Sequence, residues 1–339
     1  MVRSELTIDL GALRRNVGTL LRAVERAELW AVVKADAYGH GAAEVAAAAL
    51  EAGAPALCVA TVAEGAALRE SLAEPRILVL GPTDELREAR DARLELAVGD
   101  GPVPEGLPVH LKLDTGMGRW GYSELPAPSR DVVGLMTHLA SADSDPAFTR
   151  LQIERFRAAT DSIDGLTRHA ANSAGGLRFP EARFDAVRAG VALYGLSPFG
   201  GDPADDGLEP VLGWRSSLAQ VKLLAPGQST GYGRRFVATR PTWIGLVPIG
   251  YADGFRRDMT GAELLVDGER RRVVGTVSMD AIAVELNREL PVGTPVTIVG
   301  DGLLLEEHAG VAETINYELA CGIGSAAGRL RAQRRVLHA

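Results

Sequence analysis

Short apolar runs alternate with Ala-rich segments of helical period from about Thr7 to Leu196. Alternation of this kind predicts repeated βα units and a parallel sheet. Eight runs qualify as strands, which favours a closed (β/α)8 barrel over residues 7–208 rather than an open sheet. The expected strands are 29–33, 56–60, 77–80, 94–98, 109–113, 133–137, 168–171 and 186–194.

A different pattern begins near residue 209, where apolar and polar positions alternate with a period of two between Gly, Pro and Asp turns. This pattern predicts a second, mainly β domain over 209–339, which we expect residues 1–6 to join. Its expected strands are 216–224, 242–248, 262–266, 271–277, 281–286 and 294–299.

Charge and cysteine content narrow the class of partner. The chain has 339 residues, 46% of them hydrophobic, a net charge of −8 and no large basic cluster, which favours a small-molecule partner over nucleic acid. Cys58 and Cys321 lie far apart, so neither a disulfide framework nor a zinc site is indicated. The amino-terminal "MVRSELTIDL" is too charged for a signal peptide, and Glu44 and Glu51 interrupt the Ala-rich stretch. We therefore expect a cytoplasmic protein without a membrane span.

Chemically competent side chains fall at the ends of the expected strands. In a barrel of this type, catalytic groups lie at the carboxyl ends of the strands. Lys34 follows an apolar run, and is either a surface lysine at the start of a loop or a Schiff-base lysine activated by burial. Taken alone, the position leaves both interpretations open. The strand ends carry Lys34, Lys112, His138, Ser173 and Arg188.

Two segments have the composition of a phosphate site. Tyr38 follows Lys34 by four residues, where "YGHG" predicts the start of a helix, and a phenol at a helix entrance can donate to the phosphate of pyridoxal phosphate. The Ser173 hydroxyl and backbone N–H groups at Gly190 and Val191 would form a phosphate cup. A glycine that serves only a tight turn explains each segment equally well.

Nine motifs together make the sequence resemble the alanine racemase family from Thr7 to about Glu318. They occur in the family's order: "VVKADAYGHG", "HLKLDTGMGRWGY", "THLASAD", "ANSAG", "VRAGVALYGLSP", "GYGRRF", "PIGYADGF", "VGTVSMD" and "TINYEL". The resemblance implies a barrel followed by a β domain, with pyridoxal phosphate as the cofactor. Lys34 would hold the cofactor as a Schiff base, which costs much less to bury than an ammonium group. The phosphate would be held by Tyr38, Ser173, Gly190 and Val191.

Racemisation needs two bases, because a proton leaves one face of the α-carbon and another arrives on the opposite face. The resemblance assigns these roles to Lys34 and to Tyr232 of "GYGRRF". A phenol has a pKa of about 10, so Tyr232 needs nearby positive charge or donors. In the family, Tyr232 and Tyr251 of "PIGYADGF" match residues that reach the other subunit's site. The resemblance therefore implies a homodimer with shared sites and no metal.

The remaining matched residues concern the cofactor ring and the substrate carboxylate. Arg188 matches an arginine that hydrogen-bonds an unprotonated pyridine nitrogen, which favours racemisation over transamination, and His138 matches its hydrogen-bond partner. Arg119 matches the residue that contacts the cofactor's phenolic oxygen and the substrate carboxylate. Lys112 matches a lysine that several members carry as a carbamate, an anion able to orient Arg119.

Other matches concern the substrate channel. Met279 matches a backbone donor to the substrate carboxylate, and Asp280 matches a structural carboxylate. In "GIGSAAGR", Ser325 stands where the family has a tyrosine that binds phosphate and narrows the channel. This departure predicts a wider gate, with weaker cofactor retention or broader amino-acid tolerance.

Three other functions compete with that of a racemase, and each would require different sequence features. An amino-acid decarboxylase of the same fold would want an acidic residue at the pyridine nitrogen, where Arg188 stands. Small barrel-only pyridoxal-phosphate-binding proteins lack the β domain, and with it Tyr232. A purely structural protein gives no reason for chemistry at several strand ends. The sequence therefore predicts interconversion of L- and D-alanine, supplying D-alanine for peptidoglycan.

Overall fold

The structure, a computed structural model, describes residues 3–328 and 331–338, with side chains placed through Ser325 and again from Arg331. The second expected domain, 209–339 joined by 1–6, thus includes residues 1, 2, 329, 330 and 339, which lie outside the described part. The chain forms two compact units. The first comprises Leu13–Ala37 and Gly41–Phe199, and the second the described residues of Met1–Ala12, Tyr38–His40 and Gly200–Ala339. Each unit is described by itself.

The first unit is a closed barrel of eight parallel strands, as the alternating pattern predicts. Pairing of β9 with β2, which sets Arg188 beside Trp30, closes the ring. Most of the strand residues are buried, as is usual for parallel strands covered by helices. The strands are β2 (Glu28–Val32), β3 (Ala56–Val59), β4 (Arg76–Val79), β5 (Glu95–Val98), β6 (Val109–Lys112), β7 (Val132–Met136), β8 (Thr167–His169) and β9 (Ala186–Ala189).

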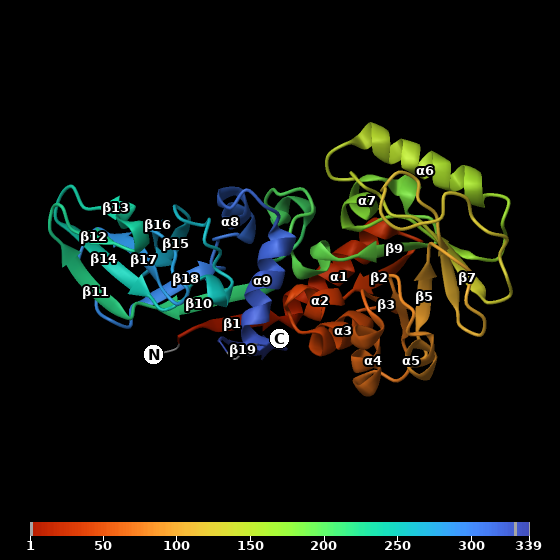
Figure 1. The fold of residues 1–339 in the computed structure, drawn as a ribbon, viewed down its shortest axis with the longest axis horizontal. Coiled ribbons are helices and arrows are strands. Elements are labelled where there is room, and N and C mark those ends of the chain that lie inside the picture. Colours follow the sequence, from red (N-terminus) through yellow and green to blue (C-terminus); the bar gives the residue numbers. More distant parts are fainter. Residues whose placement is uncertain (1–2, 329–330, 339) are drawn as a thin grey trace. The chain divides into compact units, whose positions relative to one another are not determined.

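Helices lie outside these strands (Figure 1) and begin at recognisable caps. Thr61 and Glu64 form a capping box at the start of α4. Asp145 caps α6, and Pro146 occupies the first turn, where its missing N–H costs nothing. The helices are α1 (Leu10–Val24), α3 (Ala42–Glu51), α4 (Val62–Ser71), α5 (Leu86–Asp91), α6 (Pro146–Thr160) and α7 (Ser173–Arg178), with a 3₁₀ turn η1 (Pro180–Ala182).

The expected strand over 186–194 is wrong in its second half. Strand β9 ends at Ala189, and a 3₁₀ turn, η2 (Val191–Tyr194), follows Gly190. The turn is buried, and the Tyr194 hydroxyl donates to the Val32 carbonyl at 2.8 Å. Apolar residues thus continue beyond the strand because the turn is also core, which periodicity alone does not reveal.

The second unit is built on one nine-stranded sheet in the order β11-β14-β17-β16-β15-β18-β10-β1-β19. In Figure 1 these strands carry the green and blue of the carboxyl-terminal half, apart from β1. The amino-terminal β1 pairs antiparallel with β10 and parallel with β19. Its strands are β1 (Glu5–Asp9), β10 (Leu212–Ser217), β11 (Gln220–Leu224), β14 (Thr242–Val247), β15 (Glu263–Val266), β16 (Glu269–Val274), β17 (Ile282–Leu286), β18 (Pro295–Val299) and β19 (Gln333–Leu337).

Two strands replace the single one expected over 216–224. The backbone changes partners at a corner, where Leu218 N–H donates to Thr294 and Ala219 N–H donates to Leu246. Alternation continues across this corner, so the hydrophobic pattern does not mark it. The unit also contains β12 (Ser229–Thr230), β13 (Phe236–Val237), α8 (Leu305–Val311), α9 (Asn316–Gly328), and the 3₁₀ turns η3 (Pro203–Asp206), η4 (Tyr232–Arg234) and η5 (Tyr251–Asp253).

Candidate active site

The expected barrel residues lie at or just beyond the carboxyl ends of the strands. Lys112 is the last residue of β6, Arg188 lies in β9, and Ser173 begins α7. Lys34 and His138 follow β2 and β7 by two residues. A pocket of about 620 Å³ at this end is lined in part by Lys112, Arg119 and Trp120. The barrel end therefore offers a pocket of small-molecule size whose lining carries two cations, Lys112 and Arg119, and one carboxylate, Asp100.

The segment Lys34–Tyr38 (α2) forms a left-handed turn, and the helix that "YGHG" predicts begins directly after it, as α3 with Gly41 at its N-cap. Ala35, Asp36, Ala37 and Tyr38 all have φ between 53° and 54°, in the left-handed region, and the right-handed helix α3 starts only at Ala42. Each such residue costs about 1–2 kcal/mol relative to the right-handed form. Strain of this kind persists only where surrounding contacts impose it, and it concentrates at functional sites.

Hydrogen bonds at both ends hold this left-handed turn. The Ala35 N–H donates to Glu64 Oε1 at 2.7 Å, and the Ala42 N–H donates to Asp36 Oδ1 at 2.8 Å. Glu64 is the same residue that caps α4. The turn therefore fixes the direction in which the chain leaves Lys34.

Arg188 is fully buried and surrounded by neutral acceptors. Its Nη1 donates to His169 Nδ1 at 2.6 Å and to the His169 carbonyl at 3.1 Å. Its Nη2 donates to the carbonyls of Thr137 and Ala170 at 2.8 and 3.0 Å and lies 3.4 Å from His138 Nδ1. All of these bonds use Nη1 or Nη2, and the Arg188 Nε–H donates to none of these acceptors. Burial lowers the pKa of Arg188 to about 10, so it remains a cation at neutral pH.

His169 is the nearer histidine partner of Arg188, and the residues assigned from sequence motifs do not include it. It continues into a buried chain: His169 Nε2 lies 2.8 Å from His110 Nδ1, and His110 Nε2 lies 2.9 Å from Glu95 Oε2. A signal for His110 was present, because residues two apart in a strand share a face and Lys112 marks the inward face of β6. Nothing in the sequence pairs Glu95 with it.

Lys112 is a buried lysine among other cations. Burial, followed by Arg188 and Arg119, lowers the pKa of Lys112 to about 8, although Asp114 opposes this. The Lys112 ammonium lies 5.3 Å from the Trp120 ring centroid, and the Arg119 guanidinium lies 4.9 Å from it. No described carboxylate forms an ion pair with Lys112, so this group is readily neutralised.

The Ser173 segment provides a compact hydroxyl site. Its Oγ accepts hydrogen bonds from the N–H groups of Gly190 at 2.9 Å and Ala192 at 3.4 Å. Because the oxygen accepts both bonds, the hydroxyl hydrogen is left to donate elsewhere. Ser173 and Val191 are both buried, at the junction of β9 and the turn η2.

The second unit carries Tyr232, Tyr251, Met279, Asp280 and Ser325. Three of these side chains are large and exposed to solvent: the exposed fraction is 71% for Tyr232, 41% for Tyr251 and 51% for Met279. The Tyr232 carbonyl accepts a hydrogen bond from Thr276 Oγ1 at 2.8 Å, which fixes its backbone. A contiguous apolar patch marks an interaction surface, whereas single exposed apolar side chains are common.

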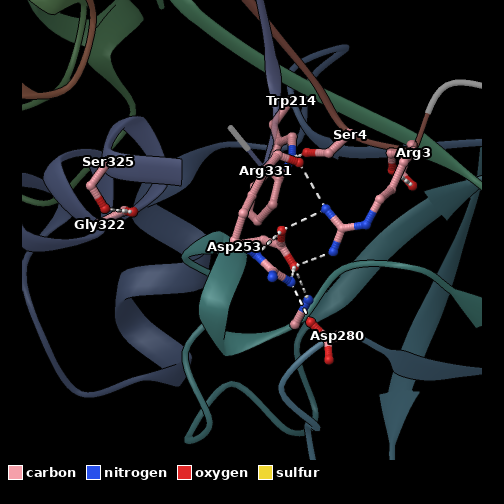
Figure 2. Close-up of polar contacts among 10 residues, drawn as sticks. Arg3, Ser4, Trp214, Asp253, Asp280, Gly322, Ser325 and Arg331 are labelled. Carbon is pink, nitrogen blue, oxygen red and sulfur yellow. Dashed lines mark hydrogen bonds and ion pairs between the residues drawn. The ribbon is translucent and has the colours of Figure 1, made fainter. Parts of the chain in front are cut away.

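Asp253 fixes the turn that carries Tyr251, as Figure 2 shows. It is fully buried and accepts hydrogen bonds from Arg3 at 2.8 and 3.0 Å and from Arg331 at 3.0 and 3.3 Å. Its Oδ2 also accepts the Gly250 N–H at 2.9 Å, and Arg331 pairs with Asp280 as well. Despite burial, these donors lower the pKa of Asp253. One carboxylate thus ties the η5 turn and Asp280 together.

Ser325 lies on α9, and its hydroxyl donates to the Gly322 carbonyl at 2.8 Å (Figure 2). The side chain is exposed and far smaller than a tyrosine. The rest of the departing segment, from residue 326 to 329, has no described side chains.

Family models cover nearly the whole chain. "Alanine racemase, N-terminal domain" matches residues 8–198, and "Alanine racemase, C-terminal domain" matches residues 211–331. The chain belongs to the alanine racemase family. The resemblance read from the motifs is confirmed, and the enzyme is a racemase.

Relatives along the full length agree with this assignment. Alanine racemase 1 of Bacillus subtilis is 39% identical, covering 95% of this chain and 91% of its own. The alanine racemase of Lactiplantibacillus plantarum is 42% identical, covering 94% and 95%. The structure of alanine racemase from Streptomyces coelicolor A3(2) matches with a TM-score of 0.90 at 38% identity, covering 99% and 98%. The barrel-plus-β-domain architecture is therefore that of the family.

Two features are absent from the described part of the racemase. No helix in the described part of the chain is both long enough and apolar enough to cross a membrane. Within residues 3–328 and 331–338, no group of three or more His, Cys, Asp or Glu side chains is placed to hold a metal ion.

Proposed function

We propose that this racemase interconverts L- and D-alanine with pyridoxal phosphate, using Lys34 on one face of the substrate and Tyr232 of a partner subunit on the other. The buried Arg188 carries the proposal. Its terminal nitrogens are fully used by backbone and histidine acceptors, whereas its Nε–H is left for one further acceptor. A neutral pyridine nitrogen is such an acceptor.

The residues present fit pyridoxal phosphate. Ser173 retains a hydroxyl hydrogen to donate, beside the Val191 N–H at the start of η2, which suits a phosphate. The Gly190 N–H, expected to bind phosphate directly, donates to Ser173 Oγ instead and so orients the hydroxyl. Lys34 follows strand β2 by two residues, and this position is consistent with a lysine that forms a Schiff base. When bound, pyridoxal phosphate supplies an electron sink that makes the α-hydrogen of an amino acid acidic.

The chain's own residues then divide the work. Lys34 Nζ and Tyr232 Oη each take or give the α-proton, one on each face. Arg188, a cation at neutral pH that does not readily release a proton, keeps the ring nitrogen unprotonated. An unprotonated ring would be a weaker electron sink, which would favour return of a proton to the α-carbon over transamination.

Arg119 is proposed to bind the substrate carboxylate, with Lys112 as its support. A lysine with a pKa of about 8 is half neutral at pH 8. Its neutral amine would form a C–N bond with CO2 and release one proton to solvent, which gives a carbamate anion. The resulting anion would pair with Arg119 and hold its planar fork for bidentate binding. It would also relieve the crowding of positive charge around Lys112.

The exposure of Tyr232, Tyr251 and Met279 supports a homodimer in which these residues complete the partner's site. We further propose a cytoplasmic enzyme that supplies D-alanine for peptidoglycan. The small side chain of Ser325 supports a wider substrate channel and tolerance of larger amino acids.

Solvent deuterium incorporation tests the two-base proposal. The wild type should exchange the α-hydrogen of both enantiomers, Tyr232→Phe should exchange only one, and Lys34→Ala neither. The chain contains three lysines, so borohydride reduction with pyridoxal phosphate should label Lys34 and spare Lys222, and Lys222→Ala is the control. Exchange of both enantiomers by Tyr232→Phe would exclude the tyrosine as a base.

A further inference from the structure

A polar chain crosses the interior of the barrel, from the pocket end to the amino-terminal end. It starts at Arg188 and passes through His169 and His110 to Glu95, with steps of 2.6, 2.8 and 2.9 Å. Glu95 is the first residue of β5, and Arg76, the first residue of β4, donates to both of its oxygens at 2.9 and 3.2 Å. Barrel interiors are usually filled with branched apolar side chains, so this chain is a departure.

The two ends determine where every proton in the chain lies. An arginine can only donate, so Arg188 requires His169 Nδ1 to be an acceptor. His169 then carries its proton on Nε2 and donates to His110 Nδ1. His110 in turn carries its proton on Nε2 and donates to Glu95. Each neutral imidazole has one donor and one acceptor nitrogen, so this arrangement satisfies all of them.

The charges of the groups agree with this direction. Burial lowers the pKa of His110, and burial together with Arg188 lowers the pKa of His169, so both rings are neutral at pH 7. Burial opposes ionisation of Glu95, but hydrogen bonds from His110 and Arg76 outweigh it and lower its pKa to about 2. The chain therefore joins a buried cation to a carboxylate anion through two polarised rings.

Packing around the rings shows that the chain is built into the barrel. Trp30 is fully buried with its ring centroid 4.6 Å from that of His169 and 5.7 Å from that of His110. Gly134 on β7 leaves room for His110, because a Cβ there would lie 2.1 Å from His110 Nδ1. Both contacts hold the rings where the hydrogen bonds need them.

We propose that Glu95 is a positioning residue for the racemase site: through His110 and His169 it fixes which nitrogen of each ring carries the proton, and so holds Arg188 in one donating orientation. This inference rests on the proposed role of Arg188 at the pyridine nitrogen. Without an acceptor at Glu95, the His110 proton can move to Nδ1, and the His169 proton must then face the Arg188 donor. The hydrogen bond from Arg188 to His169, which is the shortest of the chain, would then be lost.

The test compares Glu95→Met with Glu28→Met. Glu28 is the first residue of β2, lies 3.7 Å from Arg76 and accepts the Trp30 Nε1–H at 2.7 Å. Glu28→Met therefore removes a carboxylate beside Arg76 and the polar support of Trp30 but leaves the hydrogen bonds of the histidine chain in place, which makes it the control for changes in packing and charge alone. Nitrogen-15 NMR of histidine-labelled protein reads the tautomers, assigned with His110→Gln and His169→Gln. Both rings should be Nε2–H in the wild type and in Glu28→Met, and mixed in Glu95→Met.

Activity gives a second reading in the same variants. Glu95→Met should lower kcat for alanine by about tenfold or more, as loss of a partner behind a bound group commonly does, with KM nearly unchanged. If either ring of the wild-type protein carried its proton on Nδ1, or carried two protons, the proposal would be overturned even if Glu95→Met failed to fold. A folded Glu95→Met that kept the tautomers and the kcat of the wild type would also overturn it. If the wild type neither binds pyridoxal phosphate nor racemises alanine, the proposed function fails instead, and the tautomers still report on the chain.

Discussion

Replacing Ala35 with glycine should stabilise the racemase, although alanine-to-glycine changes usually destabilise proteins. Ala35 has a φ of 54°, in the left-handed region, and its side chain is exposed. Glycine adopts this conformation without steric cost, which relieves about 1–2 kcal/mol. The hydrogen bond from its N–H to Glu64 is kept because it involves only the backbone. The greater freedom of the unfolded chain offsets about 0.4–1 kcal/mol, leaving a net gain of roughly 0.5–1 kcal/mol.

Ala67→Gly is the matched control. Ala67 is also exposed, but it lies inside the right-handed helix α4, where glycine costs about 1 kcal/mol. The two variants should therefore differ in free energy of unfolding by about 1.5–2 kcal/mol, in opposite directions from the wild type. Urea unfolding at equal pyridoxal phosphate concentration measures both midpoints, with the slope checked for constancy. If Ala35→Gly lost as much stability as Ala67→Gly, the left-handed turn would not be strained.

Three further outcomes are expected. Asp253→Asn should lower the free energy of unfolding by about 3 kcal/mol, because Arg3 and Arg331 lose the buried carboxylate that they share. A double-mutant cycle with Arg3→Met measures the coupling between the two residues, and additive effects would contradict it. Ser325→Tyr should narrow the channel and lower the ratio of serine to alanine kcat/KM by about tenfold, whereas an unchanged ratio would exclude a gate at this position. The pKa of Glu95 is about 2 in the folded protein against an ordinary 4.5, so its stabilisation is complete above pH 4.5 and is lost as pH falls towards 2. That difference corresponds to about 3 kcal/mol, and acid unfolding of Glu95→Gln should lack this part of the pH dependence.

The sequence by itself determined the order of elements and the kind of chemistry. Apolar runs of strand length mark the barrel because parallel strands are buried on both faces, and alternation marks the second sheet. Lys34, Lys112 and Arg188 could be placed at strand ends because a residue's position in its own strand is a local property. The family motifs then gave each of them a role.

Tertiary structure decided which of these residues meet. Glu95, His110, His169 and Arg188 belong to four strands, and only the closure of the barrel brings their side chains into one hydrogen-bonded chain. The left-handed turn after Lys34 was equally hidden, because alanine has no local preference for that conformation and contacts from elsewhere impose it. Local pattern records what each residue contributes to its own element, whereas proton positions, pKa values and strain depend on neighbours that the chain supplies from a distance.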